Sequence, residues 1–364
     1  MKRTLSYNIH DLLKFQIVND GKSGFGDLQS LRFACFETEQ VGKPDIVLNI
    51  GRFTPSNEDC YLIDHRYYIK DNYFYCRETE EKASWEVEIN GLERGNTVIN
   101  FHLSRQFQIN PVNMFRLSMV LPQLFLLGLI EHKLFNKGYF LAHSAAVSKN
   151  NKAYLLSGRG GCFKTSLCMD FVRRADFNWL GDDRVILNKD KVFGFPMNSA
   201  VFRFMVKHVA DETRVGFFNQ VQFAIEYLSG KHREVAENED ESAELSALFL
   251  IARSQRLHAS KQVNFELLPQ TSREQIVDSL IISNRMEDFL AFIPGFGIDS
   301  APFLRYMLAY SFVFPSSPVT SWQRDMAERL TDTLKNIPVY RVEIPPDYSI
   351  DTFNQIHQFI IENC

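Results

Sequence analysis

A glycine-rich segment near the middle of the chain carries side chains that are typical of phosphate binding. Residues 153–166 read AYLLSGRGGCFKTS, an apolar run followed by glycines and then by Lys164 and Thr165. Glycines let successive backbone N–H groups point at one anion, and a helix that starts there adds the positive end of its dipole. Lys164 would reach the terminal phosphates of a nucleotide, and the Thr165 hydroxyl would hold Mg²⁺. The segment therefore predicts a P-loop between a strand and a helix.

One position departs from the usual P-loop pattern, because Phe163 stands where a glycine normally precedes the lysine. Either the backbone avoids positive φ there or the loop carries strain, and the ring could also shape the nucleotide pocket. The residues predicted to bind the nucleotide are Gly158, Arg159, Gly160, Gly161, Cys162, Phe163, Lys164, Thr165 and Ser166.

Two adjacent carboxylates, Asp182 and Asp183, end the apolar segment that follows the predicted helix. In P-loop proteins a carboxylate at a neighbouring strand end completes the Mg²⁺ site that the loop hydroxyl begins. The second carboxylate can take the proton of an attacking hydroxyl. We assign metal binding to Thr165, Asp182 and Asp183. The aspartate pair also supplies the base, and which of the two has which role is left open. Together with the loop, the pair predicts phosphoryl transfer to a hydroxyl acceptor.

Three regions are expected to position these residues. Residues 1–110 form a β-rich domain, residues 111–138 a connecting helix and residues 139–364 a catalytic α/β domain. The helix is predicted over 111–137, with Asn110 as its cap, Pro111 in its first turn and a kink at Pro122. Beyond Tyr139 the pattern changes to strand–loop–helix–strand. The expected fold class is an α/β P-loop core with an N-terminal β-rich α+β domain. The other expected strands are 31–37, 45–53, 61–69, 73–77, 85–89, 97–103, 139–148, 153–157, 177–183, 184–188, 191–195, 247–253, 263–268 and 338–344, and the other expected helices are 164–174, 204–230, 272–283, 302–311, 321–335 and 350–362.

The composition limits the classes of partner. The chain has 364 residues, 45% of them hydrophobic, and a net charge of −4, so no global basic field recruits nucleic acid. Its six cysteines show no CxxC pair, which is typical of reduced thiols in a cytoplasmic protein. The N-terminus lacks the apolar region of a signal peptide. The most apolar stretch, residues 117–130, is too short to span a bilayer, so we expect no membrane partner.

Four sequence segments resemble the HPr kinase/phosphorylase family. They are HSAAVS at 143–148, AYLLSGRGGCFKTSL at 153–167, WLGDDRVIL at 179–187 and GFP at 194–196. The resemblance covers roughly residues 139–196. It implies a core like that of ATP-dependent phosphoenolpyruvate carboxykinases, the use of ATP and Mg²⁺, and a catalytic His143 near the γ-phosphate or the catalytic carboxylate. It also implies a Ser or Thr hydroxyl of a protein or peptide as acceptor, and a homo-oligomeric state. The C-terminal segment with which HPr kinases hold HPr is not identified, which leaves the acceptor open.

The leading hypothesis is therefore an ATP- and Mg²⁺-dependent, HPr-kinase-like kinase. The alternatives are a non-catalytic nucleotide-binding regulatory or assembly protein, in which Phe163 marks a degenerate loop, and a small-molecule kinase closer to the carboxykinases. A cation that neutralises transition-state charge is also required in the leading hypothesis. The candidates for this role are Arg159, Arg184, Arg203 and Arg253, with Arg159 and Arg253 the first to test.

Overall fold

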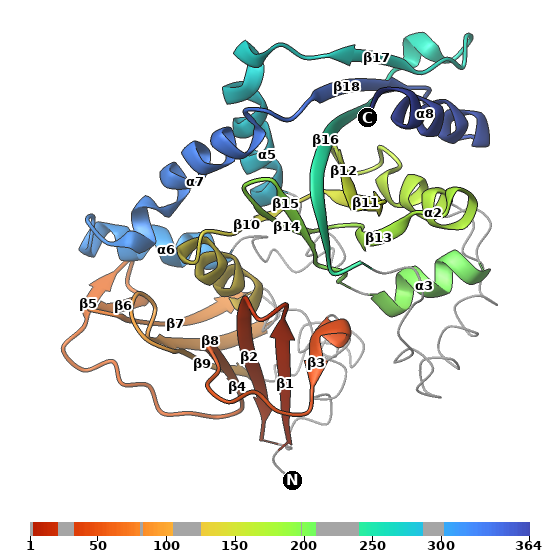
Figure 1. Ribbon diagram of the computed structural model, residues 1–364. Coiled ribbons are helices and arrows are strands. Elements are labelled where there is room, and N and C mark those ends of the chain that lie inside the picture. The colour runs from red at the N-terminus through yellow and green to blue at the C-terminus, as the bar shows by residue number, and fades with distance from the viewer. Residues whose placement is uncertain are drawn as a thin grey trace. The chain divides into compact units, whose positions relative to one another are not determined.

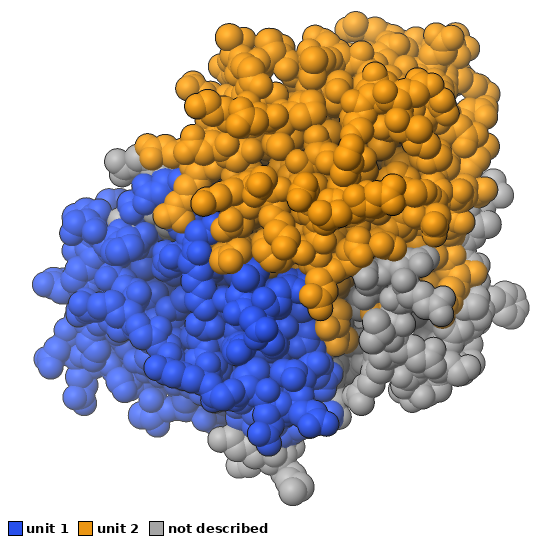
Figure 2. All heavy atoms as spheres, in the orientation of Figure 1, with its two compact units in different colours: residues 1–31, 36–138, 288–326 blue, residues 32–35, 139–287, 327–364 orange. Residues whose placement is uncertain are grey.

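The computed structural model divides the chain into two compact units (Figure 2). Unit 1 consists of Met1–Leu31, Phe36–Gly138 and Asp288–Met326, and unit 2 of Arg32–Cys35, Tyr139–Glu287 and Ala327–Cys364. The sequence placed all of 139–364 in one domain, whereas residues 288–326 group with the N-terminal unit. The residues that the structure describes are 3–20, 33–80, 83–104, 125–197, 199–208, 240–286 and 302–364.

Unit 1 is built on a mixed sheet of nine strands in the order β3-β1-β2-β4-β9-β8-β7-β6-β5 (Figure 1). Its neighbours pair antiparallel except β2 with β4 and β4 with β9, which pair parallel. The strands are β1 (Arg3–Ile9), β2 (Leu13–Asn19), β3 (Glu37–Thr38), β4 (Ile46–Ile50), β5 (Tyr61–Ile63), β6 (Tyr67–Lys70), β7 (Tyr73–Glu80), β8 (Ala83–Asn90) and β9 (Thr97–Ser104).

Aromatic packing explains why a late segment of the chain belongs to unit 1. Tyr306 of helix α6 (Pro302–Val313) is buried, and its ring stacks on Phe74 at 4.5 Å and on Phe125 at 5.3 Å between centroids. Trp85 donates a 3.4 Å hydrogen bond to the Tyr306 hydroxyl. Phe125 begins the described part of a helix that covers residues 125–136. Such stacked pairs add to the large apolar area that each ring buries, so they hold α6 in the unit 1 core.

The sequence predicted most of the unit 1 strands from their alternating pattern. The hairpin turn between β6 and β7 also lies where it was expected, at residues 71–72. The strand predicted over 31–37 is wrong, because residues 33–36 form a 3₁₀ turn. The β1–β2 hairpin was missed. The predicted Asn110 cap, the helix start at Pro111 and the kink at Pro122 lie outside the described residues.

Unit 2 has a second sheet, whose path is β10-β14-β15-β16-β12-β11-β13, with β18 paired to β16 and β17 to β18 (Figure 1). Its strands are β10 (Phe140–Ala142), β11 (Ala145–Lys149), β12 (Lys152–Ser157), β13 (Asn178–Gly181), β14 (Val185–Asn188), β15 (Lys191–Gly194), β16 (Ser242–Arg253), β17 (Asn264–Leu267) and β18 (Val339–Ile344). Its helices are α2 (Lys164–Ala175), α3 (Ser199–His208), α5 (Arg273–Met286) and α8 (Ile350–Asn363), with α7 (Pro318–Leu334) crossing the unit boundary and 3₁₀ turns at Gln255–Leu257 and Gln270–Ser272.

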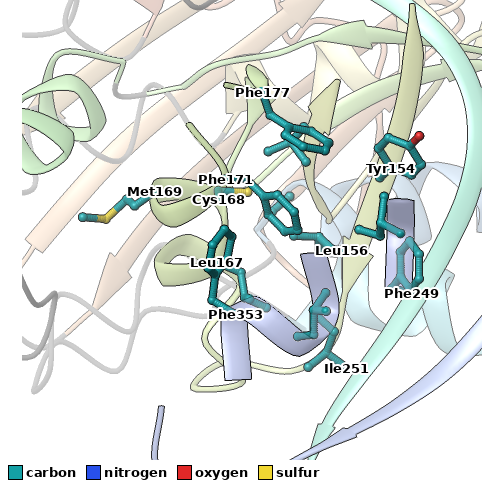
Figure 3. Packing of buried hydrophobic residues seen from close by; sticks show 14 of the residues in the cluster. Tyr154, Leu156, Leu167, Cys168, Met169, Phe171, Phe177, Phe249, Ile251 and Phe353 are labelled. Carbon is teal, nitrogen blue, oxygen red and sulfur yellow. The ribbon is translucent and has the colours of Figure 1, made fainter. Parts of the chain in front are cut away.

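The helix that leaves the glycine-rich segment is anchored by the core of unit 2 (Figure 3). Leu167, Cys168 and Phe171 lie on the buried side of α2 and are fully enclosed. Phe171 contacts Phe353 of α8 edge to face at 5.1 Å, and Phe249 of β16 belongs to the same cluster. Truncating a phenylalanine in such a core costs roughly 3–5 kcal/mol, so this packing binds α2 firmly to unit 2. The helix is therefore a rigid support for the loop at its N-terminus.

The predicted helices and strands of unit 2 appear with small shifts at their ends. The main difference is the strand expected over 139–148, which is divided into β10 and β11 at His143–Ser144. The helix expected over 204–230 is α3 up to His208, and its remainder lies outside the described residues. Within the described ranges, no helix has the length and apolarity needed to cross a membrane.

His132 makes the stability of unit 1 depend on pH. Burial, with the charge of Lys133 as a smaller cause, lowers the pKa of His132 from 6.5 to about 4. The folded protein therefore keeps this histidine neutral while the unfolded chain takes up a proton, and stability is lost as the pH falls below 6.5 toward 4. We expect His132 to contribute a loss of about 2 kcal/mol between pH 7 and pH 5, measured by urea unfolding.

A His132→Gln variant should lose that part of the pH dependence even if it is less stable at pH 7. His258→Gln is the matched control, because His258 is exposed. Equal losses between pH 7 and pH 5 in the wild type and in His132→Gln would contradict this assignment.

Candidate functional site

The site is organised by one interrupted strand, formed by β10 and β11 with His143–Ser144 between them. On one side, β13 and β14 run antiparallel along it, with Gly181 opposite Ala146 and Val185 opposite Ala142. Residues 182–184 leave the ladder where His143–Ser144 also leave it. A short stretch without ladder pairing frees backbone and side chains for other partners, as β-bulges do beside many active sites.

On the other side of the same strand lies the start of the glycine-rich loop. Ala145 of β11 pairs with Leu156 of β12, so β12 ends at the level of the interruption and continues into Gly158. The loop and residues 182–184 therefore flank His143–Ser144, two strand spacings or about 10 Å apart. This register brings together two motifs that the sequence could only place in order along the chain.

The first loop glycine is required by close approach of another strand. A Cβ on Gly158 would lie 2.5 Å from the carbonyl oxygen of Ile251 and 2.8 Å from Cys162 Sγ. Gly161 has φ of +81°, in the left-handed region that favours glycine. Arg159 and Gly160 are exposed at the loop, and Cys162 is buried beneath it.

Lys164 is the buried cation of the loop. It opens α2, its side chain is enclosed to nine-tenths, and its Nζ donates a 2.6 Å hydrogen bond to the carbonyl oxygen of Gly158. Cys162 Sγ lies 3.9 Å from the same nitrogen. No carboxylate of the described residues forms an ion pair with Lys164. Because an ammonium group loses its hydration when buried, a lysine without a counter-ion is costly unless an anion binds there.

Phe163 adopts the left-handed conformation, with φ of 63° and ψ of 26° at the N-cap of α2. Of the two expectations for this residue, the structure therefore has the strained backbone. Its ring lies 5.4 Å from the ring of Tyr348, and the Arg253 guanidinium stacks over it at 4.7 Å. Tyr348 in turn donates a 2.7 Å hydrogen bond to Asp170 of α2. Burial, reinforced by the Asp170 charge, raises the pKa of Tyr348, so the phenol stays protonated and keeps this bond.

Arg253 is exposed, and its guanidinium group contacts the loop. Its Nη1 donates to the carbonyl oxygen of Gly161 at 3.2 Å, and its Nη2 donates to that of Pro346. The Arg253 guanidinium therefore has three contacts, which are these two hydrogen bonds and the stacking on Phe163. Arg253 and Pro346 meet here because β16 and β18 are parallel and end together. Arg253 is therefore a positioning residue for the loop, and Arg203 lies on α3.

The His143 imidazole and the Asp183 carboxylate lie close together across the interruption. His143 Nδ1 lies 3.3 Å from Asp183 Oδ1, and the His143 side chain is 4% exposed while that of Asp183 is 44% exposed. Gly181 precedes the pair at a tight point, because a Cβ there would meet the carbonyl oxygen of Arg184. Asp182 is half-buried. A carboxylate that is held by a buried imidazole and still reaches solvent can receive a proton from a bound hydroxyl.

Arg184 is buried to more than nine-tenths immediately after the two aspartates. Its Nε and Nη1 atoms are enclosed and have no hydrogen-bond partner in the described structure. No described carboxylate forms an ion pair with it either. The sequence named Arg184 among four candidate cations, and its burial singles it out.

Thr165 and Ser166 occupy the first turn of α2 and are half-buried. The described residues contain no group of three or more His, Cys, Asp or Glu side chains that could hold a metal ion. Mg²⁺ in nucleotide sites commonly uses one or two carboxylates together with phosphate oxygens and water. Thr165 and either aspartate are of the right type for such a set.

Sequence reasoning missed Tyr348 and Pro346, which support the loop from the segment after β18. No motif marks them, and only the parallel pairing of β18 with β16 brings them to the site. A tyrosine soon after the last predicted strand was the one available signal, and it is too common to be informative.

Comparison with known proteins adds no family to these observations: the sequence matches no family model, and no curated protein matches it. The resemblance to HPr kinase/phosphorylase therefore stays a prediction, and the functional argument rests on the geometry of the glycine-rich loop and residues 182–184.

The close approach at Gly158 predicts a cost for any side chain there. We expect Gly158→Ala to lower the free energy of unfolding by about 1–3 kcal/mol, because the strand end or Cys162 must move. Gly42→Ala is the control, since a Cβ at Gly42 would meet no atom within 4 Å. Thermal unfolding of both variants measures the difference, and equal melting temperatures would show that the loop start tolerates a side chain.

The left-handed backbone at Phe163 predicts an unusual order of stabilities. Both Phe163→Gly and Phe163→Ala lose the ring contacts with Tyr348 and Arg253, but alanine keeps the left-handed cost that glycine avoids. We expect Phe163→Ala to be less stable than Phe163→Gly by about 1 kcal/mol in urea unfolding. The opposite order would mean that this residue is not left-handed in the folded protein.

Proposed function

We propose that the protein is an ATP- and Mg²⁺-dependent phosphotransferase that phosphorylates a Ser or Thr hydroxyl of a protein or peptide. The observation that carries this proposal is Lys164, a buried ammonium group without a carboxylate partner at the N-terminus of α2. A helix N-terminus and a glycine loop favour the same kind of ligand, a phosphate anion. The three features therefore support one preference for a polyphosphate.

The nucleotide would be held by the loop. The backbone N–H groups of Gly160 and Gly161 and the ammonium group of Lys164 are the anion-binding groups, and the Thr165 hydroxyl with Asp182 or Asp183 is of the type that holds Mg²⁺. When bound, Mg²⁺ neutralises charge on the phosphate oxygens. Arg253 and Phe163 keep the loop in place.

The aspartates support transfer to a hydroxyl. Asp183, which His143 contacts, or its neighbour Asp182 would take the proton of the acceptor hydroxyl. The acceptor oxygen forms a new bond to the γ-phosphorus, the bond from that phosphorus to the bridging oxygen breaks, and ADP leaves with the electron pair. His143 orients Asp183 from its buried position, which keeps one carboxylate oxygen directed along the interruption.

A second candidate function is supported by Phe163. A bulky left-handed residue beside the lysine is unusual, and strain of this kind costs roughly 1–2 kcal/mol in the folded protein. A nucleotide-binding protein without catalysis could keep such a rigid loop, because binding needs no rearrangement there. This candidate predicts Mg·ATP binding with no turnover.

The test measures Mg·ATP binding by calorimetry and phosphate transfer to hydroxyl acceptors for the wild type and four variants. We expect Lys164→Ala to weaken binding at least about tenfold through loss of a charged contact. Asp182→Asn and Asp183→Asn should both bind Mg·ATP. The variant that removes the base should lose turnover by about 10²- to 10⁴-fold. Asp176→Asn is the control, because Asp176 is an exposed, left-handed C-cap of α2, a conformation that asparagine also adopts.

Failure of the wild type to bind millimolar Mg·ATP would refute the proposal. Binding that is lost in Lys164→Ala but accompanied by no transfer to any acceptor would favour the non-catalytic candidate.

A further inference from the structure

A second buried cation stands on the opposite side of the β10–β11 strand from the loop. Arg184 follows Asp183, is 8% exposed, and has its Nε and Nη1 atoms enclosed without hydrogen bonds in the described structure. Nη2 is not among these enclosed, unbonded atoms. A guanidinium group stays protonated in proteins, and it therefore cannot escape the cost of burial by losing its proton.

The carboxylate next to Arg184 in the chain does not supply its counter-ion. Asp183, the adjacent carboxylate, directs Oδ1 toward His143 at 3.3 Å and forms no ion pair with Arg184. Arg273 of unit 2 is also buried and its Nη1 is likewise enclosed without a hydrogen bond, but its Nη2 donates to the carbonyl oxygen of Ile337 at 2.8 Å and its Nε to Gln270 at 3.2 Å. Burial with enclosed, unbonded nitrogens is the pattern expected of a site whose partner is a ligand.

The geometry points to a phosphate position that is separate from the glycine loop. We propose that Arg184 binds the phosphoryl group where it meets the hydroxyl acceptor. This inference rests on the phosphotransferase function proposed above. The planar fork of a guanidinium matches two oxygens of a phosphate, which a lysine cannot do. Its place next to Asp182 and Asp183 puts it beside the proposed base, and the β10–β11 strand separates it from Lys164.

The direct probe is inorganic phosphate. Phosphate should raise the melting temperature of the wild type, both alone and in the presence of saturating Mg·ADP, because ligands that bind only the folded state stabilise it. In Arg184→Gln the rise in melting temperature that phosphate causes in the presence of Mg·ADP should disappear, and phosphate binding should weaken at least about tenfold. Without phosphate, Arg184→Gln should melt no lower than the wild type, since it removes a buried charge that has no partner; a purely structural arginine would show the reverse.

Three further variants complete the design. Arg184→Lys keeps the charge without the fork, should fold, and should bind phosphate more weakly than the wild type. Arg341→Gln is the control, because Arg341 is half-exposed and already paired with Glu266. Lys164→Ala should keep the phosphate effect that Arg184→Gln loses. Mg·ATP affinity should change by no more than about twofold in Arg184→Gln, while transfer falls about 100-fold or more.

A phosphate shift that persists in Arg184→Gln, no phosphate shift in the wild type, or a tenfold loss of Mg·ATP affinity in Arg184→Gln would each overturn the separate phosphate position. Failure of the phosphotransferase proposal gives a different result: the wild type would not bind Mg·ATP, and the phosphate shift without nucleotide would still report on Arg184.

Discussion

Two buried cations without carboxylate partners, Lys164 and Arg184, are the constraint on which the rest of the site depends. Each costs free energy in a folded protein unless an anion joins it; Lys164 opens α2, and Arg184 lies between β13 and β14. Proteins retain such charges where a ligand neutralises them. Under the proposed function, the glycine loop, the start of α2 and the aspartate pair would share one physical purpose, which is to hold phosphate groups and leave one carboxylate available for a proton.

The register of one strand turns these separate residues into a site. Because β10 and β11 are nearly continuous and are interrupted only at His143–Ser144, the loop approaches from one side and residues 182–184 from the other. Packing of α2 on α8 and β16 keeps the loop end rigid, and Arg253 with Tyr348 fixes Phe163 from outside. A rigid frame of this kind suits chemistry that consists of positioning and charge stabilisation.

The sequence could predict what is local and could not predict what is brought together by pairing. The loop, α2 and the strand ending at the aspartates follow from glycine spacing, apolar periodicity and helix signals, and the structure contains these elements. For Phe163 the sequence left two possibilities, a backbone that avoids positive φ or a strained loop. The contact of its ring with Tyr348 depends on the parallel pairing of β16 with β18, which the sequence did not predict. Arg184 was one arginine among four, because burial is a property of the fold and not of the motif. The division at His143–Ser144 was missed because two polar residues within an apolar segment do not by themselves indicate a break in a strand.

Hydrogen–deuterium exchange of the wild type with and without Mg·ATP tests the central claim most directly, because it reports on each segment separately. The account predicts slower exchange in residues 158–166 and also in residues 182–184 when Mg·ATP is present, with unit 1 strands such as β1 unchanged. Protection of neither segment at saturating Mg·ATP, or protection confined to unit 1, would contradict the proposal that these two segments form one nucleotide site.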